Sequence, residues 1–283
     1  MLFNKIVSLF RLQKIVNINV VTLPSNELLK GRCALITGGT SGIGFSIAER
    51  FLNAGAAVII TGRSQAKIDA ALARLPLGRS FGIVMDNKKV DSFDSKLDEM
   101  LKQIKVVGLS QIDILVNNAG INGKGMPHAT EAEYDSIMDT NLKGVFFLSQ
   151  MFGQYFMQNG IKGNILNIAS ASSLRPADSA YSVTKWGVRG LTLGLATALA
   201  KEGITVNGIA PGPTATPMMI KENVSNLNLE RIPLGRYIMP EEIANMAVFL
   251  VSDMGRSIIG ELIYMTGGAA NLTYDDVKYG FKV

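Results

Sequence analysis

The chain has 283 residues, of which 47% are hydrophobic and 18% are charged, and this composition predicts an ordinary globular core. The net charge of +5 comes from basic residues that are scattered along the chain, so a nucleic-acid-binding protein is not expected. One histidine and one cysteine are too few for a zinc cluster, which excludes a zinc-dependent mechanism, and no metal site is expected. No uninterrupted apolar run approaches the roughly 18 residues that cross a bilayer.

Residues 1–30 differ from the rest of the chain and are predicted to form an N-terminal arm. Residues 1–16 place apolar side chains, partly at helical spacing, between Lys5, Arg11 and Lys14. Such a basic amphipathic helix is able to lie on an anionic membrane surface, and the alternative is that it packs on its own domain or on a second subunit. A signal peptide is not expected, because no small-residue cleavage site follows a clean apolar core. We therefore expect a cytoplasmic protein, with peripheral membrane contact by this arm as an open alternative.

From residue 31 to residue 270, short apolar runs alternate with stretches of helical length. This alternation predicts βαβ units and hence one α/β domain, a doubly wound, Rossmann-type parallel sheet covered on both faces. Residues 271–283 then form a C-terminal tail, which either covers a neighbouring subunit's site or packs on its own domain. The expected strands are 33–37, 57–61, 81–85, 112–117, 164–169, 205–209 and 262–265, and helices are expected at 44–53, 91–107, 130–158 and 182–200.

A glycine-rich turn follows the first expected strand and opens the first expected helix. Glycines let the backbone turn sharply and approach a ligand closely, while the free N–H groups of a helix N-terminus attract phosphate. The spacing is not the G-x-G-x-x-G dinucleotide fingerprint, but the mechanics are shared. The turn therefore predicts a nucleotide site, with Gly38, Thr40, Ser41, Gly42, Ile43 and Gly44 as candidate contacts.

The ends of the next two strands favour a particular nucleotide. The second strand ends at Arg63-Ser64, where an acidic residue would hold the hydroxyls of an unmodified ribose. A guanidinium and a hydroxyl suit a 2′-phosphate, so the sequence favours NADP over NAD, with a solvated surface arginine as the alternative. The third strand ends at Asp86-Asn87, which are placed to hydrogen-bond an adenine edge.

Tyr181 and Lys185 are four residues apart at the start of a long apolar run that lacks proline, so on a helix they share one face. A neighbouring ammonium favours the phenolate, which predicts that the pKa of Tyr181 falls from its ordinary value of about 10 toward neutrality. Such a tyrosine is able to give a proton to an alkoxide or to take one from an alcohol. The alternative is an exposed helix face.

Six motifs follow one another along the chain. They are Thr37-Gly38-x-x-x-Gly42-Ile43-Gly44, Asn117-Asn118-Ala119-Gly120, Asn141, Ser170 in Asn167-Ile168-Ala169-Ser170, Tyr181-x-x-x-Lys185, and Pro211-Gly212. They occur in the order found in the short-chain dehydrogenase/reductase family, which the sequence resembles over about residues 31–268. The resemblance implies an oxidoreductase that interconverts a carbonyl and a secondary alcohol by hydride transfer, working as a homodimer or homotetramer through the helices expected at 130–158 and 182–200.

The resemblance also implies a role for each matching residue. Tyr181 would be the general acid/base, Lys185 would lower its pKa and hold the nicotinamide ribose, and Ser170 would hydrogen-bond the substrate carbonyl. Asn141 would hold a water that relays protons to Lys185, with an ordinary polar residue as the alternative. The remaining candidate cofactor contacts are Asn118, Ala119, Gly120, Pro211, Gly212, Thr214 and Thr216.

The sequence departs from the family pattern between Ser170 and Tyr181. They are eleven residues apart, slightly fewer than is common, which leaves Ser172 and Ser173 as competitors. Ser170 is favoured because it directly follows the fifth strand.

The substrate is expected over residues 121–128, 171–179 and 214–236. These stretches contain few fixed charges, which favours an apolar or 3-oxoacyl-type carbonyl substrate. His128 either faces this pocket or lies on a surface loop. A non-catalytic NADP-binding scaffold is the competing function, and the complete set of expected catalytic residues argues against it. The apolar candidates for the pocket are Met126, Met218, Met219, Ile220 and Leu227.

Overall fold

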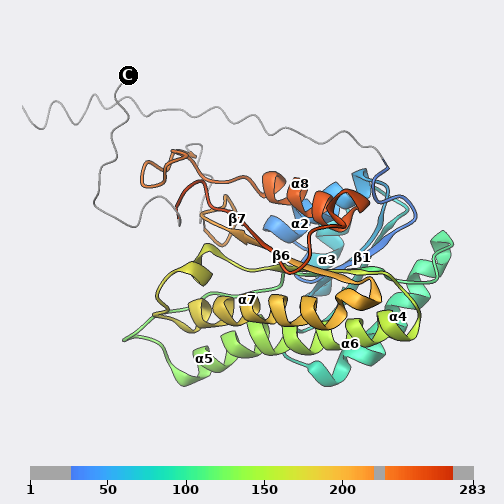
Figure 1. Ribbon diagram of the computed structural model, residues 1–283, viewed down its shortest axis with the longest axis horizontal. Coiled ribbons are helices and arrows are strands. Elements are labelled where there is room, and N and C mark those ends of the chain that lie inside the picture. The colour runs from blue at the N-terminus through green and yellow to red at the C-terminus, as the bar shows by residue number, and fades with distance from the viewer. Residues whose placement is uncertain (1–26, 220–226, 270–283) are drawn as a thin grey trace, which may run out of the picture.

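A parallel β-sheet forms the centre of the computed structural model, which describes residues 27–219 and 227–269 (Figure 1). Within these ranges the sheet has seven strands in the order β3-β2-β1-β4-β5-β6-β7, which confirms the doubly wound α/β prediction. The expected strand bounds are within two residues of those observed. The strands are β1 (Cys33–Ile36), β2 (Ala57–Gly62), β3 (Ser80–Val84), β4 (Ile114–Asn117), β5 (Asn164–Ile168), β6 (Thr205–Pro211) and β7 (Leu262–Met265).

Helices cover both faces of the sheet, and the packing of β1 between them explains why all of its residues are apolar. Ala34 and Ile36 pack in the core shared with α2, α3 and α8, whereas Cys33 and Leu35 pack in the core shared with α4, α6 and α7. Side chains that alternate between two buried faces require a continuous apolar run. The helices are α2 (Gly42–Asn53), α3 (Gln65–Leu72), α4 (Phe93–Ile104), α5 (Glu131–Met138), α6 (Gly144–Gln158), α7 (Ala180–Leu199) and α8 (Pro240–Val251).

The helix expected over residues 130–158 is interrupted. A π-helical turn, Asp139–Lys143, separates α5 from α6. The Asn141 side chain explains the interruption, because its Oδ1 accepts a hydrogen bond from the Ile121 N–H at 2.9 Å and its Nδ2 donates to the Ile121 carbonyl at 2.8 Å. The turn is thereby held against the loop that follows β4.

The core of the domain includes residues that precede the domain boundary predicted at residue 31. Leu29 is fully buried in the core beside α2, and its N–H donates to the Ala54 carbonyl at 2.8 Å. The membrane-surface helix predicted for residues 1–16, the rest of the arm up to residue 26, and the tail at 271–283 lie outside the described residues. Among the described helices, none is long and apolar enough to cross a membrane.

The chain reverses its winding direction between β1 and β4, and the carboxyl ends of these strands are tied together. Thr37 follows β1, and its Oγ1 accepts hydrogen bonds from the Asn118 and Ala119 N–H groups at 3.0 Å each. The Asn118 amide in turn donates to the carbonyls of Thr37 and Gly38 at 2.9 and 3.1 Å. Because a crevice forms where the strand order reverses, this edge of the sheet is the expected ligand site.

A buried polar network lies at the amino-terminal ends of β1, β4 and β5, opposite the expected ligand site. Arg32 Nε donates to Asp113 Oδ2 at 2.8 Å, and Arg32 Nη2 donates to Asn164 Oδ1 at 2.6 Å. The Cys33 N–H donates to Asp113 Oδ1 at 3.0 Å. Burial raises the pKa of both the Asp113 carboxyl and the Cys33 thiol. None of these groups lines the crevice at the other edge, so the network serves to join β1, β4 and β5.

Candidate active site

A cavity of about 1010 Å³ opens at the carboxyl ends of the strands. This volume lies at the upper end of the range for ligand sites, roughly 300–1,000 Å³, and suits a dinucleotide together with a second molecule. Every predicted cofactor contact except Gly44 lines it, and so do three of the four predicted catalytic residues, Asn141 being the exception.

The glycine-rich turn forms one wall of the cavity. Gly38 and Gly42 have φ values of +65° and +55°, a left-handed conformation that favours glycine, and a Cβ on Gly42 would come within 3.3 Å of Thr216 Cγ2. Gly44 was predicted as a cofactor contact, but it does not line the cavity. A Cβ there would collide with the Asn118 amide and lie 2.6 Å from the Gly38 carbonyl, so Gly44 is needed for close packing behind the turn.

The N-terminus of α2 forms part of the same wall. Its N-cap residue, Ser41, makes no side-chain capping hydrogen bond, and the first turn contains no acidic residue. Ser41, Gly42 and Ile43 line the cavity. Uncapped N–H groups at the positive end of a helix bind phosphate, so the diphosphate of a dinucleotide fits here.

The β2–β3 end of the cavity contains the groups predicted for the adenosine. Arg63 is exposed at the cavity wall, and Asp86 and Asn87 line it close by. The Asn87 side chain is 4% exposed, and its Nδ2 has no hydrogen-bond partner among the described residues. A buried donor without a partner is costly, so this amide fits an acceptor on a bound base.

Lys67 also lines this end, beside Ser64, and the sequence analysis missed it. Lys67 lies in the first turn of α3, three residues after the N-cap Ser64. Lys67 lies near Arg63 because α3 begins at this point in the chain. In the sequence, only a sign of that helix start, a serine before an apolar pattern, could have identified Lys67.

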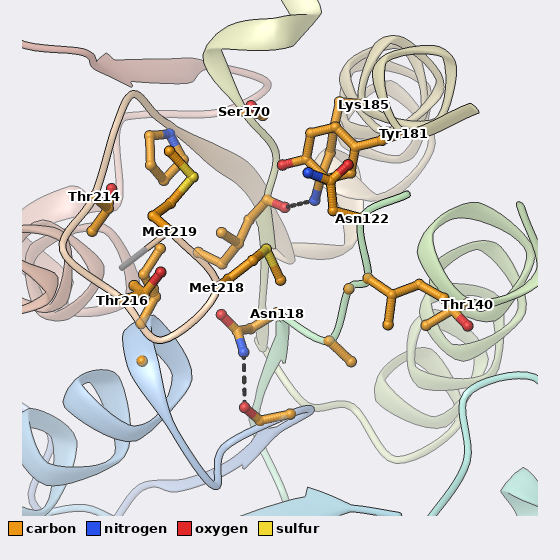
Figure 2. A pocket seen from close by; sticks show the side chains of 18 of the residues that line it. Asn118, Asn122, Thr140, Ser170, Tyr181, Lys185, Thr214, Thr216, Met218 and Met219 are labelled. Carbon is orange, nitrogen blue, oxygen red and sulfur yellow. Dashed lines mark hydrogen bonds between the residues drawn. The ribbon is translucent and has the colours of Figure 1, made fainter. Parts of the chain in front are cut away.

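Tyr181, Lys185 and Ser170 meet at the other end of the cavity (Figure 2). Helix α7 begins at Ala180 because the Ser179 hydroxyl accepts a hydrogen bond from the Ser182 N–H, and both Tyr181 and Lys185 extend from this helix into the cavity. The Ser170 side chain lies beside the Tyr181 hydroxyl. Lys185 Nζ lies 5.5 Å from the centroid of the Tyr181 ring and donates to the Ile168 carbonyl at 2.8 Å.

The electrostatics of this cluster differ from the sequence prediction. Burial raises the pKa of Tyr181, and the hydrogen bond from Ser170 opposes the rise only in part. Burial also lowers the pKa of Lys185 to about 8. The predicted fall of the Tyr181 pKa toward neutrality is therefore wrong for this arrangement, because removing the phenolate from water outweighs the attraction of a lysine that is itself desolvated.

The choice between the three serines is decided by their contacts. Ser173 is fully buried, donates to the Ser170 carbonyl at 2.7 Å and does not line the cavity. Ser172 lines the cavity, but it is Ser170 whose hydroxyl contacts Tyr181. The geometry favours Ser170 as the group beside the reacting oxygen.

Asn141 lies behind the cavity wall. Its side-chain amide is engaged by the Ile121 backbone and also donates to Thr184 Oγ1 at 3.4 Å. A water held by Asn141 would therefore have to bind its backbone carbonyl, so the relay stays a prediction.

The substrate end of the cavity is more polar than predicted. Met218 and Met219 extend into it from the loop after β6, but Met126 is 72% exposed and lies outside it, as do Leu227 and the exposed His128. Ile220 is outside the described residues. The sequence analysis expected few fixed charges here and missed Asn122, Arg175, Asp178 and Arg231, which all line the cavity. No group of three potential metal ligands occurs among the described side chains.

Comparison with known proteins identifies the family. Residues 38–270 match the family profile described as enoyl-(acyl carrier protein) reductase. A 3alpha-hydroxysteroid dehydrogenase of Mediterraneibacter gnavus is 37% identical over 252 residues, which cover 86% of this chain and 98% of that protein. A 3-ketoacyl-(acyl-carrier-protein) reductase of Brucella melitensis, solved in complex with NADH, is 30% identical with a TM-score of 0.77, covering 86% of this chain and 99% of that one. A short chain dehydrogenase of Burkholderia cenocepacia in complex with NADP is also 30% identical, with a TM-score of 0.75 and coverage of 85% and 98%.

The doubly wound sheet and the glycine-rich turn at its switch point are typical of dinucleotide-binding α/β proteins. The chain belongs to the short-chain dehydrogenase/reductase family, and it is an enzyme of this family of oxidoreductases.

Proposed function

We propose that the protein is an NADP(H)-dependent oxidoreductase that interconverts a carbonyl and a secondary alcohol. The observation that supports this most strongly is the meeting of Ser170, Tyr181 and Lys185 at one end of a cavity whose other end presents Arg63. Relatives solved with NADH and with NADP support a nicotinamide cofactor.

The residues that would hold the cofactor follow the length of the cavity. The α2 N-terminus would hold the diphosphate, and Asp86 and Asn87 would contact the adenine. Arg63 and Lys67 would bind the 2′-phosphate, which is the feature that separates NADP from NAD. When bound, the nicotinamide supplies or accepts the hydride.

The protein's own residues would position the substrate and move one proton. Ser170 orients the carbonyl oxygen against the Tyr181 hydroxyl, and Tyr181 gives a proton to that oxygen in reduction or takes it back in oxidation. A phenol with a raised pKa is protonated at neutral pH, which is the form that reduction needs. Lys185, protonated below pH about 8, stabilises the phenolate as it forms. Met218 and Met219 favour a substrate with an apolar part, of the 3-oxoacyl type or similar.

Replacing Arg63 by serine is expected to lower kcat/KM for NADPH by about 10- to 100-fold, because hydrogen bonds to a charged group contribute roughly 1.5–3 kcal/mol. The value for NADH should change by less than about threefold, since NADH lacks the phosphate. A panel of carbonyl substrates followed by nicotinamide absorbance tests both the cofactor and the reaction. Turnover by the wild-type enzyme with NADH alone would show that the assignment of Arg63 is wrong.

We also propose that the protein is a homodimer or homotetramer in which α6 and α7 form a contact between subunits. These helices lie side by side and expose large apolar side chains, including Phe146 at 46% and Leu193 at 50% exposure (Figure 1). Exposed apolar groups on adjacent elements mark interaction surfaces.

Replacing Leu193 by arginine is expected to reduce the mass of the particle, measured by sedimentation equilibrium, because a charge would be buried in the contact. Leu77→Arg is the matched control, since Leu77 is 89% exposed in the turn between α3 and β3. Equal masses for wild type and Leu193→Arg would argue against a contact at this face.

A further inference from the structure

Two arginine side chains, Arg175 and Arg231, line the substrate end of the cavity, and neither has a role in the proposed hydride transfer. Arg175 is tied to the turn that follows β7, and the residue after Arg231 packs against the same turn. Arg175 Nη2 donates to the Ala269 carbonyl at 2.6 Å. Arg231 precedes Ile232, whose Cδ1 would be 3.1 Å from a Cβ on Gly267 in the same turn.

The turn after β7, which these segments contact, lies far along the sheet from the adenosine groups. It follows β7, the edge strand beside β6, whereas Arg63 follows β2 on the other side of the switch point. Arg175 is also fixed to the catalytic helix, because its carbonyl accepts a hydrogen bond from Trp186 Nε1 at 2.8 Å, and Trp186 directly follows Lys185 in α7. The positive charges are therefore on the same side of the cavity as Tyr181.

The charges at this end are unbalanced. Arg231 is exposed to the cavity and makes no hydrogen bond or ion pair with any described residue. Asp178 is the one carboxylate that the described residues contribute here, and its backbone carbonyl accepts from the Met126 N–H, which ties it to the loop after β4. Together with the Lys185 ammonium, two guanidinium groups and one carboxylate leave an excess of positive charge for a ligand.

We propose that the substrate bears a carboxylate in addition to its reacting carbonyl, and that Arg231, supported by Arg175, binds this carboxylate. A guanidinium presents two parallel N–H donors that match the two oxygens of a carboxylate, and the excess of positive charge favours an anionic group on the substrate. Met218 and Met219 would contact the carbon skeleton between the two groups. This inference rests on the proposed function, because it assumes that Tyr181 marks the reacting carbonyl.

The experiment compares oxo acids with their methyl esters, over separations of about two to eight methylene groups between the carbonyl and the carboxyl. The wild-type enzyme is expected to reduce at least one acid with a kcat/KM on the order of 10- to 100-fold above that of its ester, because a charge-assisted bidentate pair is lost in the ester. In Arg231→Gln the ratio should fall to within about threefold, through a higher KM for the acid.

Two further variants separate a specific contact from a general effect of charge. Arg231→Lys retains the charge without the paired donors and should retain part of the preference. Lys102→Gln removes one positive charge from an exposed position on α4, outside the cavity, and should leave the ratio unchanged.

Equal reduction of acid and ester by the wild type, or an unchanged ratio in Arg231→Gln, would overturn the inference. If no carbonyl compound is reduced with either cofactor, the proposed function fails instead. In that case, calorimetric titration of the acid and the ester in the presence of NADP tests the carboxylate site independently of turnover. Tighter binding of the acid in wild type than in Arg231→Gln supports the site, and equal binding refutes it.

Discussion

Replacing Tyr181 by phenylalanine is expected to lower kcat for carbonyl reduction by roughly 10²- to 10⁴-fold, the usual contribution of a positioned general acid. The phenylalanine ring fills the same space, and only the hydroxyl beside Ser170 is removed. The affinity for NADP should change by less than about threefold, because the glycine-rich turn and Arg63 are untouched. Steady-state kinetics and fluorescence titration of NADPH measure the two quantities.

Tyr134→Phe is the matched control for this experiment. Tyr134 is exposed on α5 and does not line the cavity, so loss of its hydroxyl should leave kcat unchanged. Retention of more than about a tenth of the wild-type kcat in Tyr181→Phe would remove Tyr181 from the proton-transfer step.

Replacing Lys185 by methionine is expected to lower kcat by a similar factor and to change how stability depends on pH. Burial lowers the pKa of Lys185 from 10.5 to about 8 in the folded protein. Between these two values the unfolded chain binds more protons than the folded one, so the wild-type free energy of unfolding rises with pH through this interval. Below pH about 8 the buried charge opposes folding, and above about 10.5 the lysine is neutral in both states.

The methionine variant lacks this titration. The difference in unfolding free energy between wild type and Lys185→Met should therefore change by about 3 kcal/mol between pH 7 and pH 11, in favour of wild type at high pH. Urea unfolding at each pH measures it, with Lys201→Met as the control because Lys201 is exposed at the end of α7. A difference that is independent of pH would show that the Lys185 ammonium is not desolvated.

The strands and the glycine-rich turn were predictable because their signals are local. β1 is a run of four apolar residues followed directly by a threonine and two glycines, and both features follow from the identity of adjacent residues. The π-helical turn at Asp139–Lys143 was not predictable, because its cause is the contact of Asn141 with Ile121, which lies twenty residues earlier in the chain.

The sign of the Tyr181 pKa shift and the character of the substrate end were both wrongly predicted, for a related reason. Sequence spacing places Lys185 one turn from Tyr181 but says nothing of how deeply α7 buries them, and burial decides the direction. Periodicity likewise does not give the path of a loop. Met126 therefore lies outside the cavity that it was expected to line, whereas Arg231 lines it.

The hydrogen bonds between Thr37 and the segment after β4 have a consequence for cofactor affinity. They join the two walls of the cavity into one preorganised surface, so little conformational entropy would be lost there when a dinucleotide binds. If Arg63 and Lys67 bind the 2′-phosphate as we propose, selectivity between dinucleotides arises at the solvent-facing rim of the cavity, apart from the catalytic end.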